Sequence, residues 1–358
     1  MRSPTAKTTA EPQPNSRQPD VTRRTGRHGA SAERLLRTTR RTESKIPDRS
    51  GLPPLDSYAH LRRPQGDALV VGYTEATRGC RHLCRHCPIV PVYQGRFVVI
   101  EPDVVLGDIR QQVVAGARHI TFGDPDFLNG PTHALRIVRQ MHKEFPDTTY
   151  DVTIKVEHLR RHVDLLPELQ ATGCILVTTA IESFDDAILE HFDKRHTAED
   201  LAFVLEAMRG IGLAINPTFV TFTPWTTIDG FIRFLETIVR LDLVQNISPA
   251  QYAIRLLVPA GSKLLELPEM TELVGPFDAN LLCHPWTHSD PAVDQLFSRV
   301  TEIVASDQHM ATSRSETFTQ VWEAAHESRN GSAPTSAAPD LGVLPVAAIP
   351  YLTEPWYC

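Results

Sequence analysis

The sequence predicts an α/β protein built as a partial (β/α)6 TIM-like barrel, and two observations lead to this fold class. From Ala68 onward, strand-like and helix-like segments alternate about six times, which is the pattern of βα units around a parallel sheet. Polar residues follow several of these strands directly, as they do at the C-terminal rim of an α/β barrel. Six units predict an open, partial barrel rather than a closed eight-stranded one.

The expected strands are short apolar runs, and the third alternates apolar with polar residues from Tyr150 to Glu157. The outward face of a barrel meets the helices and is apolar, so Asp151, Thr153 and Lys155 are expected to face a lumen that receives a polar ligand. An edge strand with one wet face would give the same pattern. The expected strands are residues 68–74, 119–122, 150–157, 174–181, 213–222 and 251–258.

The expected helices have apolar residues at helical spacing and recognisable N-terminal signals. Pro131 suits a first helical position. Ser183 with Asp186, and Thr197 with Asp200, are spaced as capping boxes. The expected helices are residues 101–115, 131–145, 185–192, 197–210, 228–241, 291–305 and 317–327.

Composition indicates a soluble, cytoplasmic protein. The chain has 358 residues and a net charge of -7, and no apolar run approaches the roughly 18 residues that cross a bilayer. The N-terminus lacks the apolar core of a secretory signal. Six cysteines, three of them in one loop, do not resemble a disulfide scaffold, so a reducing compartment is expected.

The chain is expected to divide into four parts. Residues 1–50 are predicted to be a disordered basic arm, 51–65 a Pro-rich lead-in, 66–305 the core, and 306–358 a C-terminal extension and tail. The basic residues of the arm are not interleaved with aromatics. A solvated tail is therefore favoured over an arm that binds nucleic acid.

Three cysteines lie within eight residues, directly after the first strand. Cys80, Cys84 and Cys87 are spaced so that one loop can turn all three sulfurs toward a common point. Thiolates are soft ligands that favour zinc, Cu(I) or an iron–sulfur cluster. A cluster with three cysteine ligands and one open iron fits the count better than a four-ligand zinc site. A structural zinc site with His82 or His86 as fourth ligand is the alternative.

The Cys-x3-Cys-x2-Cys spacing resembles the signature of the radical S-adenosylmethionine (radical SAM) enzymes, and the resemblance extends over the core, residues 66–305. It implies that Cys80, Cys84 and Cys87 hold a [4Fe-4S] cluster whose open iron binds S-adenosylmethionine. Reductive cleavage of S-adenosylmethionine then releases methionine and a 5′-deoxyadenosyl radical that abstracts hydrogen from a substrate, which stays unknown. A reductant protein of the flavodoxin or ferredoxin type is implied as partner. The runner-up is a zinc-binding regulatory or nucleic-acid-binding protein.

The resemblance also implies contacts to S-adenosylmethionine at three further places. The sequence Gly123-Asp124-Pro125-Asp126 replaces the family's Gly-Gly-Glu-like motif, so Asp124 or Asp126 is expected at the amino group. The pair after the fourth strand is similar to a Glu-Ser pair that reaches the ribose and the methionyl part, although Ser183 has an equal use as a helix cap. His86 occupies a position near the adenine that is commonly aromatic. The cofactor candidates are thus Asp124, Asp126, Glu182, Ser183 and His86.

Other polar residues have weaker signals. Three basic residues are candidates to pair with a carboxylate of S-adenosylmethionine or substrate, but each is more often a salt-bridged structural residue. Two histidine pairs have the i,i+4 spacing of metal ligands on a helix, but they lack a third ligand and are interpreted as surface residues. Cys174 is expected to be a small core residue. The basic candidates are Lys155, Arg195 and Arg255, and the pairs are His158 with His162 and His284 with His288.

Several phrases, among them TRGCRHLCRHCP, HITFGDPDFLNGP and LTEPWYC, look like a bacterial radical SAM family whose chains end in Cys-Cys-Ala-Glu-Pro or Cys-selenocysteine-Ala-Glu-Pro. That family carries an N-terminal domain resembling a cobalamin-binding one. Here the first 50 residues do not predict a folded domain, and the use of cobalamin stays open. The chain stops at Cys358, one residue before the expected position, so we hypothesise that a UGA selenocysteine codon was read as a stop.

Overall fold

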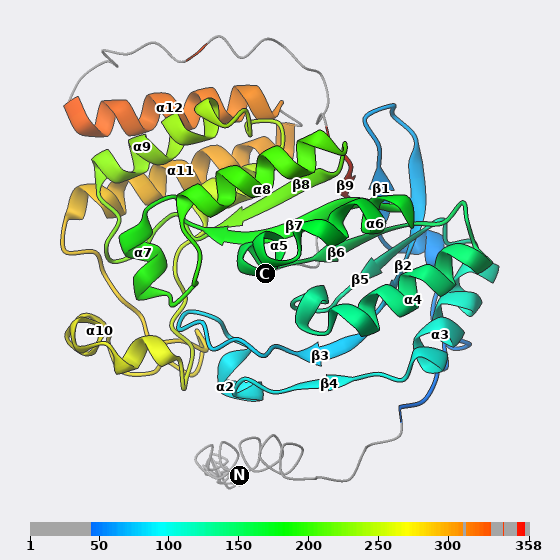
Figure 1. Ribbon diagram of the computed structural model, residues 1–358. Helices are drawn as coiled ribbons and strands as arrows, with labels where there is room; N and C mark the ends of the chain where they lie inside the picture. Colours follow the sequence, from blue (N-terminus) through cyan, green and yellow to red (C-terminus); the bar gives the residue numbers. More distant parts are fainter. Residues whose placement is uncertain (1–43, 311–312, 331–338, 340–348, 355–358) are drawn as a thin grey trace, which may run out of the picture. The chain divides into compact units, whose positions relative to one another are not determined.

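The computed structural model describes residues 44–310, 313–330, 339 and 349–354. Its centre is a seven-stranded sheet that curls into part of a barrel, with the strand order β8-β7-β6-β5-β2-β1-β9 (Figure 1). β2, β5, β6, β7 and β8 are parallel neighbours, and β1 and β9 extend one edge in the antiparallel direction. The strands are β1 His60–Arg62, β2 Ala68–Thr74, β5 His119–Phe122, β6 Thr149–Thr153, β7 Cys174–Glu182, β8 Ala214–Phe219 and β9 Tyr351–Leu352.

The predicted fold class is confirmed, and the third predicted strand corresponds to β6. β6 lies between β5 and β7, so the edge-strand interpretation is wrong. The strand is shorter than expected because Lys155 is the N-cap of helix α5, and Val156 and Glu157 are already helical. The predicted alternation holds within the strand, since Tyr150 and Val152 are fully buried in the apolar core on the helix side.

The sixth predicted strand, residues 251–258, is not formed as a strand. Pro249–Ala253 is a 3₁₀ helix, and a single parallel bridge joins Phe222 to Arg255. The side-chain carbonyl of Gln251 accepts a hydrogen bond from the backbone N–H of Phe219 at 2.8 Å. The Gln251 side chain therefore accepts the hydrogen bond from a backbone N–H at the edge of β8. That N–H is no longer available to a sixth strand. The barrel is consequently open beyond β8.

The helices predicted between the strands are present with ends within a few residues of those expected. The Thr197–Asp200 capping box is confirmed, whereas the Ser183–Asp186 box is wrong because Asp185 is the N-cap of α7. The helices are α2 Val90–Tyr93, α3 Pro102–Val114, α4 Pro131–Glu144, α5 Val156–Arg161, α6 Leu166–Ala171, α7 Asp186–His191, α8 Ala198–Gly210, α9 Ile228–Arg240, α10 Pro268–Leu273, α11 Pro291–Met310 and α12 Arg314–Asn330.

The main apolar core lies between the sheet and its helices. Ile109 of α3, Met141 of α4 and Leu205 of α8 are buried in the same cluster as the outward side chains of β5 and β6. α11 and α12 pack beside α9, and their residues Val300 and Phe318 join this core (Figure 1). The helical part of the C-terminal extension is thus continuous with the core of the barrel.

Both ends of the described chain are attached to this body. Residues 1–43 of the predicted arm lie outside the described residues, but Arg49 donates to both carboxylate oxygens of Asp108 at 2.7 and 2.9 Å. Arg49, which lies within the predicted arm, is thus attached to α3 by an ion pair. At the other end, Thr353 donates from its backbone N–H to the carbonyl of His60, which fixes β9 beside β1.

Of the helices in the described part of the chain, none combines the length and the apolar content that crossing a bilayer requires.

Candidate active site

A cavity of about 690 Å³ opens at the C-terminal ends of the parallel strands. Asp151 and Thr153 of β6 line it, together with Thr178 of β7 and Thr218 of β8. The prediction that the polar face of the third strand points into a lumen is therefore confirmed for these residues. The outward residues of the strands are buried against the helices, so the inward residues face the cavity. Functional groups of α/β barrels gather at this C-terminal end of the strands.

The cysteine loop lies beside this cavity. It lies between β3 (Thr77–Gly79) and β4 (Phe97–Val99), which pair with each other, and Cys87 is one of the cavity-lining residues. The backbone of Arg85 fixes the loop on two sides: its N–H donates to the carbonyl of Phe192, and its carbonyl accepts from the hydroxyl of Ser262. Segments distant in sequence thus hold the loop at the mouth of the cavity.

Gly79 sets the direction in which the loop leaves β3. Its φ is +85°, a conformation that residues with a Cβ rarely adopt. A Cβ at this position would lie 2.4 Å from the ring of Tyr93 and 2.6 Å from the carbonyl oxygen of Arg96. Only glycine fits the start of the cysteine loop.

The three loop thiols are too far apart for a single metal ion. One zinc ion holds two thiolates about 3.8 Å apart. Among the described residues, Cys80, Cys84 and Cys87 do not form a group whose ligand atoms all lie within 4.8 Å of one another. His82 and His86, the proposed fourth zinc ligands, contact other groups instead. A centre larger than one ion, with its ligands spread around it, fits the loop better.

Burial weakens the acidity of two of the loop thiols, Cys80 and Cys87. It raises the pKa of Cys80 to about 11 and also raises the pKa of Cys87. A bound metal centre would favour the thiolate forms, because ligand thiols are deprotonated by the metal.

A buried charged network stands beside the loop. Glu182 accepts hydrogen bonds from Lys194 and lies next to the ring of His86, with both nitrogens 3.0 Å from the same carboxylate oxygen. Burial alone would raise the pKa of Glu182, but the charge of Lys194 and the contact with His86 outweigh it and hold the pKa well below its usual range. Burial likewise opposes the charge of Lys194, yet Glu182 and the nearby thiols Cys84 and Cys87 raise its pKa.

Glu182 also has an unusual backbone. Its φ is +70°, and the pairing of β7 with β8 shifts register between Ala180 and Glu182. A non-glycine residue in this region is strained, and such strain is concentrated at functional sites. The bulge aims the carboxylate toward the cavity, which Glu182 and His86 both line.

The remaining cofactor candidates separate into two groups. Asp124 lines the cavity, where its carboxylate accepts from the N–H groups of Ala76 and Thr77 at 2.8 and 2.6 Å and from the Thr77 hydroxyl at 2.6 Å. Burial nevertheless raises the pKa of Asp124 to about 7. Asp126 faces His82 and His158 and is not a lining residue of the cavity.

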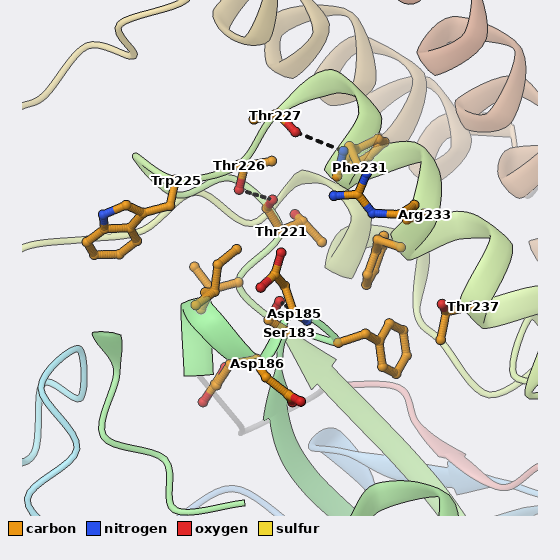
Figure 2. A pocket seen from close by; sticks show the side chains of 16 residues that line it. Ser183, Asp185, Asp186, Thr221, Trp225, Thr226, Thr227, Phe231, Arg233 and Thr237 are labelled. Carbon is orange, nitrogen blue, oxygen red and sulfur yellow. Dashed lines mark hydrogen bonds between the residues drawn. The ribbon is translucent and has the colours of Figure 1, made fainter. Parts of the chain in front are cut away.

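Ser183 lines a second, smaller cavity of about 340 Å³ between the end of β7, α7, the segment after β8 and α9. Figure 2 shows Ser183, Asp185 and Asp186 on one side of it, opposite Thr226 and Arg233. Glu182 is common to both cavities. The structure thus brings His86, Asp124 and Glu182 together at the large cavity and leaves Asp126 and Ser183 outside it.

The three basic candidates are all engaged elsewhere. Arg255 lines the large cavity but donates to Asp294 at 2.7 Å and lies over the ring of Trp286. Lys155 is buried and pairs with Glu157 at 3.0 Å. The side chain of Arg195 is 62% exposed beside Asp193. Each therefore has a structural partner, as sequence reasoning favoured.

Each histidine pair contains one residue that is buried, so the interpretation of both pairs as surface residues is corrected. His158 is fully buried, so its interpretation as a surface residue is wrong. His288 is also buried, and its Nδ1 accepts from the backbone N–H of Asp290. Cys174 is a buried core residue of β7, as expected.

Lys194 is the functional candidate that sequence reasoning missed. It lies in a short loop after α7 with no periodic pattern, and neighbouring charges on both sides make it look like a surface residue. Its burial to 3% exposure and its contact with Glu182 appear only when the loop folds against the cysteines. The sequence signal that could have indicated a functional role is the position of Lys194, directly after the fourth βα unit.

This fold and site define an enzyme class in which a partial α/β barrel presents three loop cysteines at the rim of a cavity. Comparison with known proteins gives the same class. The family model described as the radical SAM superfamily matches residues 74–238.

Two known proteins illustrate the similarity. The tRNA-2-methylthio-N(6)-dimethylallyladenosine synthase of Desulfosudis oleivorans is 27% identical over 226 residues, which are 58% of this chain and 46% of that protein. The solved structure of the cobalamin-dependent S-adenosylmethionine radical enzyme OxsB, with aqua-cobalamin and S-adenosylmethionine bound, has a TM-score of 0.56 at 13% identity. It covers 69% of this chain and 46% of that one, and it shows the similarity of fold. The chain spans less than half the length of each.

The family model and the curated relative thus support a radical SAM enzyme, with the similarity lying in the part of the chain that carries the cysteine loop and the parallel strands. Enzymes of this superfamily use a [4Fe-4S] cluster and S-adenosylmethionine.

Proposed function

We propose that the protein reductively cleaves S-adenosylmethionine at a [4Fe-4S] cluster held by Cys80, Cys84 and Cys87. When bound, the two cofactors supply an electron and a 5′-deoxyadenosyl radical that abstracts hydrogen from the substrate. The observation that carries this proposal is the position of the cysteine loop. Cys87 lines the same cavity as Glu182 and the inward residues of β6.

The residues around the loop suit a cluster with thiolate ligands. Three ionised thiols carry negative charge in a buried place, and the ammonium group of Lys194 lies close enough to Cys84 and Cys87 for charge interaction. A buried cation beside the thiolates stabilises their charged form. Lys194 is itself held by Glu182, so its position is fixed before the cluster is loaded.

Two parts of the cavity wall are proposed to hold S-adenosylmethionine. The carboxylate of Asp124 is occupied by three donors, so its role is to position the backbone of Gly123 and Pro125, which faces the cavity. Glu182 and His86 line the same cavity, and His86 belongs to the cysteine loop. The ring of His86 is backed by Phe192, with 4.3 Å between ring centroids, and offers a flat face for the adenine. Asp126 and Ser183 are not retained as ligands of S-adenosylmethionine.

The substrate is proposed to combine an apolar part with hydrogen-bonding groups. Leu256, Leu257, Leu281 and Leu282 line the cavity together with Asp151 and the threonines. The curated relative makes a methylthiolated adenosine in tRNA, as its name states. The net charge of -7 disfavours a polyanion such as RNA, so a small substrate is preferred.

Two finer proposals concern partners and subfamily. An electron donor of the flavodoxin or ferredoxin type is proposed because S-adenosylmethionine cleavage needs a potential at the reducing end of the iron–sulfur range. The resemblance to the family with Cys-Cys-Ala-Glu-Pro tails stays a proposal. It is supported by Leu352, which brings the beginning of the LTEPWYC segment to the cavity, while Cys358 lies outside the described residues. The nucleotides after the Cys358 codon test it, since Ala-Glu-Pro must follow in frame.

The test of the main proposal is cofactor loading of the full chain. Anaerobic reconstitution with iron and sulfide is expected to give a brown protein with four irons per chain, whose reduced-cluster electron paramagnetic resonance signal changes when S-adenosylmethionine is added. A colourless protein that takes up zinc at the cysteines instead would support the zinc-binding alternative and overturn the proposal.

A further inference from the structure

Three side chains from different elements converge at the cysteine loop, and none of them lines the large cavity. His82 comes from the loop itself, Asp126 from the turn after β5, and His158 from α5. One ligand atom of each lies within 4.8 Å of the corresponding atoms of the other two. This is the one such group of histidine, cysteine and carboxylate side chains in the described part of the chain.

The three side chains lie close enough together to surround a single ion, to which His158 would present one of its two ring nitrogens. The Nε2 atoms of His82 and His158 are 3.2 Å apart, and Asp126 Oδ2 lies 3.7 Å from Nε2 of His82. Two nitrogen or oxygen ligands of a tetrahedral zinc ion lie about 3.3 Å apart. One set of ligand atoms from the three side chains lies within 4.8 Å, so side-chain movements on the order of 1 Å would bring them to this spacing.

The group also contains polar atoms without hydrogen bonds. Asp126 and His158 are almost completely buried, at 1% and 0% exposure. Asp126 Oδ2 and His158 Nδ1 are 2.8 Å apart, yet neither atom has a hydrogen-bond partner. The other carboxylate oxygen of Asp126 accepts from the N–H of Leu128, so Oδ2 alone is left over. A buried carboxylate oxygen without a donor is costly, and a cation beside it would remove that cost.

Neighbouring charges permit a cation here. Lys155 lies 3.5 Å from Nδ1 of His82, but its charge is balanced by Glu157 at 3.0 Å. Glu157 is also 3.6 Å from Nδ1 of His82. A carboxylate on that side of the ring favours a proton on Nδ1 and leaves the lone pair of Nε2 toward Asp126 and His158, as is usual behind metal-bound histidines.

We propose that His82, Asp126 and His158 bind a divalent transition-metal ion, with zinc as the probe, at a site separate from the cysteines. Two imidazoles and one carboxylate are a donor set that zinc accepts. The ion joins the cysteine loop to β5 and α5, and it stabilises the loop rather than reacting with substrate. This inference goes beyond the proposed function and does not depend on it.

The experiment separates this site from the cysteines. In the full-length variant Cys80→Ser/Cys84→Ser/Cys87→Ser, zinc bound after dialysis is measured by mass spectrometry and by competition with a chromophoric chelator. One tightly bound zinc per chain is expected. Adding His158→Ala to this background should abolish binding, whereas His162→Ala, one helical turn away, should leave it unchanged.

A second measurement guards against loss of folding. Zinc should raise the thermal unfolding midpoint of the triple-serine variant, because a ligand of the native state stabilises it. The isosteric change Asp126→Asn should remove that shift while the circular dichroism spectrum stays native. Absence of zinc from the triple-serine variant, or a zinc content and thermal shift that survive both His158→Ala and Asp126→Asn, would overturn the proposal. The three residues would then form only a hydrogen-bonded cluster. The iron content of the wild-type chain reports separately on the proposed function.

Discussion

The ammonium group of Lys194 lies 3.0 Å from a carboxylate oxygen of Glu182, and both side chains are buried beside the cysteine loop. The pair links the end of β7 to the loop after α7. Glu182 is a strained residue at a bulge. The ion pair and the contact with His86 together hold its side chain in place.

Replacing Lys194 by methionine should destabilise the protein strongly. The change leaves the carboxylate of Glu182 buried with His86 as its remaining contact, and breaking a buried pair costs about 3 to 5 kcal/mol. Urea unfolding of the full chain measures this. The double variant Lys194→Met/Glu182→Gln is the control, because it removes both charges and should recover part of the loss. Equal stability of wild type and the single variant would contradict the role given to this pair.

The low pKa of Glu182 predicts a pH effect on stability. In the unfolded chain Glu182 takes up a proton near its ordinary pKa of 4.5, whereas in the folded chain it stays ionised at lower pH. The unfolded state therefore binds more protons below about pH 4.5, and folding stability falls as the pH decreases. Unfolding free energies measured from pH 6 down to pH 3, in roughly half-unit steps, should fall less steeply for Glu182→Gln than for wild type. Parallel curves of unfolding free energy against pH for the two proteins would show that Glu182 does not contribute to the pH dependence of stability.

Gly79→Ala should disturb the start of the cysteine loop. The added Cβ clashes with the Tyr93 ring and the Arg96 carbonyl, in addition to the strain of a positive φ. Both the thermal midpoint and the iron content after reconstitution should fall. Gly116→Ala is the matched control, since Gly116 also has a positive φ but nothing lies within 4 Å of its Cβ position. If the two variants lose equal amounts of iron, the clash at Gly79 is irrelevant to the loop.

Asp124→Ala should weaken binding of S-adenosylmethionine without removing the cluster. The change leaves the buried N–H groups of Ala76 and Thr77 without their acceptor, which costs about 1 to 3 kcal/mol for each group. The wall formed by Gly123 and Pro125 then loses its support. Equilibrium dialysis with labelled S-adenosylmethionine should give a raised dissociation constant at unchanged iron content. Thr77→Val, which removes only the side-chain donor, should have a smaller effect.

Much of the fold could be predicted because its signals are local. The residues of β2 and β5 were predicted without error, since each is a short apolar run next to polar or turn residues. The Thr197–Asp200 box likewise depends on residues three apart. The sixth strand was wrong because Gln251 uses its side chain to contact Phe219, which is a tertiary contact that no periodicity indicates.

The site was less predictable than the fold for the same reason. The cysteine spacing is a local pattern and was visible in the sequence, but the roles of Asp126 and His158 depend on which loops meet in space. His158 was paired with His162 on sequence distance, whereas the structure places it against Asp126 and His82. Lys194 was overlooked because burial of a lysine depends on a partner elsewhere in the chain, here Glu182.

The most direct test of the account is formation of 5′-deoxyadenosine. The reconstituted wild-type chain, incubated anaerobically with S-adenosylmethionine and a strong reductant, should produce 5′-deoxyadenosine and methionine, measured by liquid chromatography. Cys84→Ser should produce neither, whereas Cys174→Ala, a change in the core of β7, should retain production. An iron-loaded wild-type chain that produces no 5′-deoxyadenosine, or a Cys84→Ser variant that produces as much as wild type, would contradict the central claim.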